Sequence, residues 1–218
     1  RTRILVKLTR FLLVSAPNRP FHELAEPSQL TPRINMNVIL LPGSGCTPTM
    51  ECNYYSWLAK TLVDRGICAD VRVTVPGMPD PHVCRRAKWI PHCEEVLKCD
   101  ANSVVVGHSS GAVCALRLAE RNVLRGIVLV AGYDDDLGDE NERASGYFGP
   151  DPFDYEKMKT NCTKGIDAVI GLRDSLVPAE VQRALAAKLD ARETLCERRD
   201  HFFTPPAEEI VEAIMHFV

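Results

Sequence analysis

Residues 104–119, which read VVVGHSSGAVCALRLA, decide the fold of this chain. A short β-branched run ends abruptly at Gly107, and a helical pattern of apolar residues begins just after Ser109. The stretch therefore predicts a buried strand, a sharp turn with a serine at its apex, and a helix.

Gly107 and Gly111 flank Ser109 in a Gly-x-Ser-x-Gly pattern. In a nucleophile elbow the turn is so tight that side chains two residues before and two residues after the serine would collide, so both positions need glycine. The turn lifts the serine hydroxyl above the sheet edge, and the N-terminus of the next helix points its N–H groups toward it. The alternative is an ordinary strand-to-helix turn in which the serine is a cap. The flanking strand and helix patterns favour the elbow.

The composition is that of one medium-sized globular domain. The chain has 218 residues, 45% of them hydrophobic, and a formal net charge of -3. This length can bury a sizeable core. A net charge of -3 does not indicate the basic surface that nucleic-acid binding requires. The sequence contains no run of 18 apolar residues, the length needed to cross a bilayer. We therefore expect a soluble protein that acts on a small-molecule substrate and contacts neither nucleic acid nor membrane.

The nine cysteines show no C-x-x-C pair and no repeated spacing. This pattern indicates reduced thiols and a cytoplasmic location. His82, Cys84, His92 and Cys93 suggest a zinc site, but adjacent ligands such as His92 and Cys93 rarely close one tetrahedron. We expect no metal and no other cofactor.

Residues 1–35 form a predicted N-terminal extension before a single domain at 36–218. The extension begins with a basic, amphipathic stretch in which Arg3, Lys7 and Arg10 share one helical face. Such a start is typical of a mitochondrial transit sequence, which makes a mitochondrial location the alternative to a cytoplasmic one. The interpretation we favour for this stretch is a disordered extension or a misassigned gene start, since residues 15–33 carry four prolines and no periodicity.

From residue 37 onward, short apolar runs alternate with helical patterns. This alternation predicts βα units and an α/β fold, with about six mostly parallel strands flanked by helices on both faces. The expected strands are 38–41, 70–75, 103–106, 126–130, 167–171 and 192–196. The expected helices are 54–65, 85–97, 110–121, 152–159, 179–189 and 207–217.

Two further residues follow predicted strands in the order that an activated serine requires. A serine hydroxyl needs a base to take its proton, and the base needs an acid to fix its tautomer. In this fold class the order is serine, acid, histidine, and the loops after the last two strands supply Asp174 and His201. Taken singly, Asp174 is explained as a helix cap and His201 as a structural histidine. Their joint placement predicts a catalytic triad of Ser109, Asp174 and His201.

The loop after the first predicted strand, Pro42 to Cys46, is the expected second half of an oxyanion hole. One N–H donor follows the nucleophile, at Ser110, and we expect Ser44 to provide the other. The loop also resembles a weak phosphate cradle, but the helix-opening lysine of a P-loop is missing.

Several residues are candidates for the walls of the pocket around Ser109. Glycines let the backbone approach a ligand closely, and aromatic side chains form pocket walls or core. His108 is expected to pack or line the pocket rather than act as base, because its side chain diverges from Ser109. The candidate pocket residues are Gly43, Gly45, His108, Tyr133 and Phe202.

An acidic run at residues 134–142 lies just past a strand end near the predicted site. Such a run is usually a solvated loop that caps itself, which is the interpretation we favour. The alternative is that its charge attracts a cationic amine, as an aminoacyl ester or short peptide would carry.

Four runs closely resemble one known family: GHSSGA at 107–112, LVAGY at 129–133, DLGDENERASGYF at 136–148 and MPDP at 78–81. The family is the retinoblastoma-binding protein 9-like serine hydrolases of the α/β-hydrolase class, and the resemblance extends from residue 38 to the C-terminus. It implies a compact α/β-hydrolase domain at 36–218 without a large lid domain. It also implies a triad of Ser109, Asp174 and His201.

Two departures from the family pattern concern function. Asp200 stands where the family usually has glycine, and it either raises the basicity of His201 or only faces solvent. The family's L-x-C-x-E motif for the retinoblastoma pocket corresponds to residues 97–101, LKCDA, so alanine replaces the closing glutamate. Because a short motif depends on few contacts, we expect Ala101 to remove most of the affinity for that pocket.

Together these observations predict a serine hydrolase that cleaves a small ester, thioester or amide, including aminoacyl substrates, through an acyl-enzyme on Ser109. The alternative is a catalytically weak hydrolase-fold scaffold that acts in protein–protein interaction.

Overall fold

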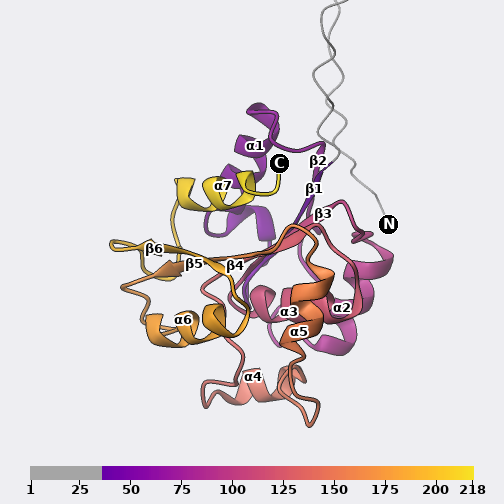
Figure 1. The fold of residues 1–218 in the computed structure, drawn as a ribbon, viewed down its shortest axis with the longest axis vertical. Helices are drawn as coiled ribbons and strands as arrows, with labels where there is room; N and C mark the ends of the chain where they lie inside the picture. Colours follow the sequence, from indigo (N-terminus) through magenta and orange to yellow (C-terminus); the bar gives the residue numbers. More distant parts are fainter. Residues whose placement is uncertain (1–35) are drawn as a thin grey trace, which may run out of the picture. The chain divides into compact units, whose positions relative to one another are not determined.

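The computed structural model describes residues 36–218, so the predicted extension at 1–35 lies outside the described residues. Within that range, six strands form one sheet in the order β2-β1-β3-β4-β5-β6, and every neighbouring pair is parallel (Figure 1). The strands are β1 (Asn37–Leu41), β2 (Asp70–Arg72), β3 (Ser103–His108), β4 (Gly126–Val130), β5 (Ile166–Gly171) and β6 (Arg192–Cys196).

Helices connect the strands and cover both faces of the sheet (Figure 1). Helices α1 and α7 lie on one face, and α2, α3, α5 and α6 lie on the other. The helical elements are η1 (Thr49–Glu51), α1 (Tyr55–Asp64), α2 (Arg86–Glu95), α3 (Ser110–Arg121), α4 (Glu140–Ser145), α5 (Tyr155–Asn161), α6 (Ala179–Lys188) and α7 (Glu208–Met215). The predicted α/β fold class is confirmed, and no lid domain is present in residues 36–218.

The four inner strands β1, β3, β4 and β5 are buried and mostly apolar because both of their faces are covered, whereas the edge strands β2 and β6 are more polar and more exposed. In β1, Val38 and Leu40 join the core beneath α1 and α7, whereas Ile39 and Leu41 join the core beneath α2 and α3. Successive side chains of a strand point to opposite faces, so a sheet between two helical layers needs apolar residues at every position. This explains why the inner strands appear in the sequence as continuous runs.

The strand order reverses between β1 and β3, since β1 has β2 on one side and β3 on the other. The chain leaves β1 toward α1 on one face and leaves β3 toward α3 on the opposite face. Ligands of open α/β sheets bind where the connections diverge in this way, at the carboxyl ends of the strands. The loop at residues 42–46 and the turn at Ser109 both lie there.

The structure corrects two predicted elements and adds a helix that was not predicted. The predicted strand 70–75 pairs with β1 only through Arg72, and beyond it Thr74 bonds to His92 and Pro76 accepts from the N–H of Thr49. The predicted helix 152–159 begins only at Tyr155 because Asp154 caps it. A short helix, α4, lies in the region expected to be loop.

Candidate active site

Ser109 occupies a strained turn between β3 and α3. Its φ of 54° and ψ of -122° lie in a region that residues with a side chain rarely adopt. A Cβ at Gly107 would lie 2.3 Å from the carbonyl oxygen of Gly111, and one at Gly111 would lie 2.3 Å from that of Leu41. Glycine is therefore required at both positions, as predicted. At Gly111 the reason is also the close approach of α3 to the end of β1.

Asp174 and His201 lie in the loops after β5 and β6 and meet beyond the carboxyl ends of these strands. His201 Nδ1 and Asp174 Oδ2 are 2.8 Å apart, and both side chains are buried. A carboxylate only accepts, so Nδ1 carries the proton and Nε2 is left as the basic nitrogen. This is the arrangement that a histidine base requires.

The Asp174 carboxylate accepts four hydrogen bonds. Oδ1 accepts from the N–H groups of Leu176 and Val177, both at 2.9 Å, and Oδ2 accepts from His201 and from Gln182 Nε2. Burial alone would raise the pKa of Asp174, but the bonds from His201 and from the backbone hold it below its usual value. The carboxylate is therefore charged and fixed in one orientation.

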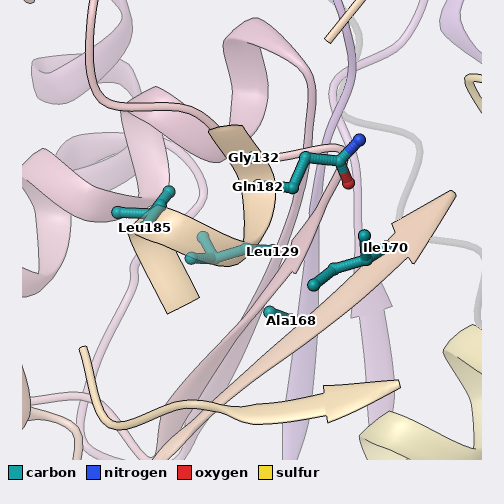
Figure 2. A pocket seen from close by; sticks show the side chains of 6 residues that line it. All are labelled: Leu129, Gly132, Ala168, Ile170, Gln182 and Leu185. Carbon is teal, nitrogen blue, oxygen red and sulfur yellow. The ribbon is translucent and has the colours of Figure 1, made fainter. Parts of the chain in front are cut away.

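Gln182 of α6 is a further hydrogen-bond donor to Asp174. Its Nε2 donates to Asp174 Oδ2 at 3.2 Å and to the carbonyl of Val177 at 2.7 Å. Figure 2 shows the small pocket that Gln182 shares with the apolar side chains and glycine between α6 and strands β4 and β5, namely Leu129, Gly132, Ala168, Ile170 and Leu185. Its amide is the polar group of this pocket, and it is turned toward the acid.

The residues around His201 separate into core and surface. Phe202 has no exposed surface and belongs to the core beneath α1 and α7, so it is not the pocket wall that the sequence suggested. Phe203 is 45% exposed, and its ring centroid lies 5.4 Å from that of His201. Asp200 is exposed, and its carboxylate accepts from the N–H of Phe203.

The loop at residues 42–46 packs directly against the nucleophile. A Cβ at Gly43 would lie 3.4 Å from Cβ of Ser109. The N–H of Gly43 donates to Tyr55 Oη, and the N–H of Gly45 donates to the carbonyl of Pro81. Neither of these two groups is free for an oxyanion. Within residues 36–218, the N–H groups of Ser44 and Ser110 have no hydrogen-bond partner, which leaves them free for that role.

Tyr133 and Glu142 lie on the other side of the elbow. Tyr133 is buried, and its hydroxyl lies 3.3 Å from Ser110 Oγ. Ser110 Oγ donates to Glu142 Oε1 at 3.0 Å. Burial raises the pKa of Glu142, and bonds from Tyr133 and Ser110 offset part of that rise. The Glu142 carboxylate is thus hydrogen-bonded to the residue that directly follows the nucleophile.

Three of the six acids in the run 134–142 cap backbone groups of the same segment, in line with the interpretation we favoured. Asp135 accepts from the N–H of Leu137, Asp136 accepts from that of Gly138, and Asp139 caps α4. Its first residue, Asp134, accepts from Tyr155 and Lys188. Glu142 is different because it turns inward to Ser110.

His108, the last residue of β3, is buried, and its ring lies among Tyr54, Tyr55 and His201. Both of its ring nitrogens have partners, Tyr55 Oη and the carbonyl of His201. Burial, followed by the charge of His201, lowers the pKa of His108 to about 3. It therefore packs beside the site, as expected, and is unsuited to act as base.

Sequence reasoning missed Tyr55 and Gln182, and it named Glu142 only as part of the acidic run at 134–142. Gln182 left a signal, because it lies three and four residues before Leu185 and Ala186 and so falls on the buried stripe of α6. A polar residue on such a stripe needs a partner. Tyr55 and Glu142 have no comparable local pattern.

Residues 36–218 contain no group of three or more His, Cys, Asp or Glu side chains that could hold a metal ion. No helix in this range combines the length and apolar character that a membrane span requires.

Comparisons with known proteins agree with this fold. Residues 38–160 match the alpha/beta hydrolase family. The chain is 35% identical over 176 residues to serine hydrolase RBBP9 of Rattus norvegicus, which covers 81% of this chain and 92% of the rat protein.

Two solved structures share the fold at lower identity. The ydeN gene product of B. subtilis superposes with a TM-score of 0.69 at 23% identity, covering 83% of this chain and 98% of that one. Est1E from Butyrivibrio proteoclasticus, solved with ferulic acid bound, superposes with a TM-score of 0.60 at 16% identity, covering 87% and 90%. The chain therefore belongs to the alpha/beta hydrolase family and, within it, to the serine hydrolases related to retinoblastoma-binding protein 9.

Proposed function

We propose that the protein hydrolyses a small ester, thioester or amide through an acyl-enzyme on Ser109. His201 is the general base, Asp174 orients it, and the N–H groups of Ser110 and Ser44 bind the oxyanion. The observation that carries this proposal is the buried hydrogen bond between His201 and Asp174, 2.8 Å long, beside an elbow that strains Ser109 into a positive φ. A structural histidine would not need both features together.

The proposed reaction has two halves. Ser109 Oγ attacks the substrate carbonyl carbon while His201 Nε2 takes its proton, and the carbonyl oxygen becomes an oxyanion held by two N–H groups. His201 then gives that proton to the leaving group, and the acyl group stays on Ser109. A water molecule then gives a proton to His201 Nε2 and attacks the acyl carbon. The bond between that carbon and Ser109 Oγ breaks, His201 returns the proton to Oγ, and the acid is released.

Among the esters, thioesters and amides proposed as substrates, the position of Glu142 favours those with an aminoacyl group. Its carboxylate is bonded to Ser110, next to the nucleophile, and is partly buried. A charged carboxylate with little water around it attracts a cationic amine more strongly than a solvated one does. A substrate with its amino group next to the scissile carbonyl would match that placement.

The substitution Ser109→Ala tests the role of the nucleophile. We expect hydrolysis of p-nitrophenyl esters to fall by more than about 10³-fold, with an unchanged circular dichroism spectrum and melting temperature. Ser56→Ala is the matched control, because Ser56 is an exposed serine of α1. A folded Ser109→Ala protein with a rate comparable to wild type would defeat the proposal.

We also propose that the chain does not bind the retinoblastoma pocket. Ala101 lacks the carboxylate of the motif, and Leu97, its first residue, is buried. A pull-down with the isolated retinoblastoma pocket should capture neither the wild type nor, because Leu97 is buried, much of an Ala101→Glu variant. Strong capture of the wild type would favour the scaffold function instead.

A further inference from the structure

His108 is a buried ionisable residue that the proposed reaction leaves without a role. It is the last residue of β3, directly before Ser109, and both of its ring nitrogens are hydrogen-bonded. Nδ1 lies 2.6 Å from Tyr55 Oη, and Nε2 lies 2.9 Å from the carbonyl oxygen of His201. The partners come from α1 and from the loop after β6, which are far apart in the sequence.

The groups at the two ends of this chain of hydrogen bonds fix its direction. The N–H of Gly43 can only donate, and it donates to Tyr55 Oη at 2.9 Å. The carbonyl of His201 can only accept. The Tyr55 hydroxyl must therefore donate to His108 Nδ1, and His108 Nε2–H must donate to His201. Asn53 Nδ2 also donates to Tyr55 Oη at 3.2 Å, and Cys46 Sγ lies 3.8 Å from the same oxygen.

This direction requires a neutral His108 with its proton on Nε2. A protonated imidazole would place an N–H on Nδ1 and would lose the acceptor that Tyr55 needs. Burial keeps the ring neutral across the pH range in which hydrolases work. The connection therefore does not change with pH in that range.

The two ends of the chain belong to the two halves of the proposed machinery. Gly43 precedes Ser44, the expected second oxyanion donor, and a Cβ at Gly43 would already lie 3.4 Å from Cβ of Ser109. His201 is the proposed base. We propose that Tyr55 and His108 are positioning residues. Their hydrogen bonds form a bridge that holds the loop at residues 42–46 and the loop after β6, which carries His201, at a fixed separation around Ser109. This inference rests on the proposed function.

Aromatic packing makes the bridge stiff. The ring centroids of Tyr54 and Tyr55 are 4.9 Å apart, and those of His108 and His201 are 4.8 Å apart. All four side chains are buried. Replacing tyrosine by phenylalanine keeps this packing and removes only the hydroxyl, so the hydrogen bonds can be tested apart from the rings.

The test compares Tyr55→Phe with Tyr54→Phe. Tyr54 is the matched control because it is equally buried, but its hydroxyl has no partner within residues 36–218. We expect Tyr55→Phe to lower kcat for p-nitrophenyl esters by about 10- to 100-fold, because small displacements of catalytic groups have effects of this size. KM should change by less than about threefold. Tyr54→Phe should leave kcat within about twofold of wild type.

A tetrahedral analogue separates positioning from general stability. The affinity of an alkyl boronic acid should fall in Tyr55→Phe by about the same factor as kcat/KM, since both depend on the oxyanion hole. Combining Tyr55→Phe with His108→Phe should lower kcat no further than the worse single change, because either one breaks the same bridge. His108→Gln, which can donate through Nε2 and accept through Oε1, should recover part of the rate lost in His108→Phe.

Nitrogen NMR of ¹⁵N-labelled wild type reports the tautomer without relying on activity. We expect His108 to carry its proton on Nε2 from pH 5 to pH 8. The other tautomer, or unchanged kcat and boronate affinity in Tyr55→Phe, would overturn the bridge. So would fully additive losses in the double variant. Failure of the proposed function would instead appear as a wild type without esterase activity, whatever the tautomer.

Discussion

The loops after β4 and β5 both carry acids close to the elbow, and they hold them differently. Residues 134–142 contain six acids, of which Asp135, Asp136 and Asp139 accept from backbone N–H groups of the same loop. Residues 172–178 contain one acid, Asp174, whose buried carboxylate accepts four hydrogen bonds. In the first loop three acids bind backbone N–H groups of their own segment, whereas in the second loop four donors, His201 among them, converge on one acid.

The comparison shows that the surroundings of a carboxylate decide its role. Exposed carboxylates that cap turns remain solvated, and their charges are screened. Asp174 is shielded from water, so its interaction with His201 is strong and directional. Glu142 is intermediate, because it belongs to the first loop but bonds to Ser110 as a partly buried group.

The largest expected effect comes from removing the charge of Asp174. Asp174→Asn should lower kcat for esters by about 10³- to 10⁴-fold, because an amide in that place favours the wrong tautomer of His201. Steady-state kinetics on a variant with an unchanged melting temperature measure the effect. The same chemical change in the other loop, Asp136→Asn, should alter kcat by less than about twofold. A loss below tenfold in Asp174→Asn would mean that another acid serves His201.

A smaller effect is expected from Gln182, which supports Asp174 without contacting His201. Gln182→Leu keeps the size of the side chain but removes the Nε2 donor to Asp174 and Val177. We expect kcat to fall by about tenfold and KM to stay nearly constant, since the acid loses orientation but keeps its charge. Gln182→Glu should be more harmful, because a second carboxylate beside Asp174 would repel it. Equal rates in wild type and Gln182→Leu would show that the backbone N–H groups alone fix the acid.

The smallest effect is expected from Glu142, and it should depend on the substrate. Glu142→Gln should raise KM about fivefold for aminoacyl p-nitroanilides or esters and leave KM for acyl esters without an amine unchanged. The reason is that only the cationic amine interacts with the carboxylate charge.

The preference for aminoacyl substrates should also depend on pH, in a direction that the pKa of Glu142 determines. Because burial raises the pKa of Glu142, the group keeps its proton to a higher pH than an ordinary glutamate. The preference of the wild type for aminoacyl substrates should therefore increase as the pH rises through that pKa and decline below it. Glu142→Gln should show no such change, measured as the ratio of kcat/KM for the paired substrates. A preference that is the same in both proteins would remove Glu142 from substrate recognition.

The strands and the elbow could be predicted from the sequence because short-range patterns of apolar residues and glycines determine them. The inner strands β1, β3, β4 and β5 appear as apolar runs because they are covered on both faces, and the elbow appears because Gly107 and Gly111 have no space for a Cβ. The pairing of Asp174 with His201 could be predicted because the carboxyl ends of parallel strands share one edge, so residues just after such strands become neighbours.

The supporting residues could not be found in the same way. Tyr55 and His108 are separated by 53 positions, and His108 and His201 by 93. No periodicity links such positions, because their contact depends on how α1 and the loop after β6 pack against β3. The sequence also could not show which of two adjacent phenylalanines lies beside His201. Phe202 enters the core, whereas Phe203 packs against His201.

Labelling with a fluorophosphonate probe, followed by peptide mass spectrometry, tests the central claim most directly. The account predicts that wild type is labelled on Ser109 and that folded Ser109→Ala is not labelled. It also predicts that Asp174→Asn reacts far more slowly than Asp136→Asn. A folded wild type that resists the probe, or a label on any other serine, would contradict the assignment of Ser109 as the activated nucleophile.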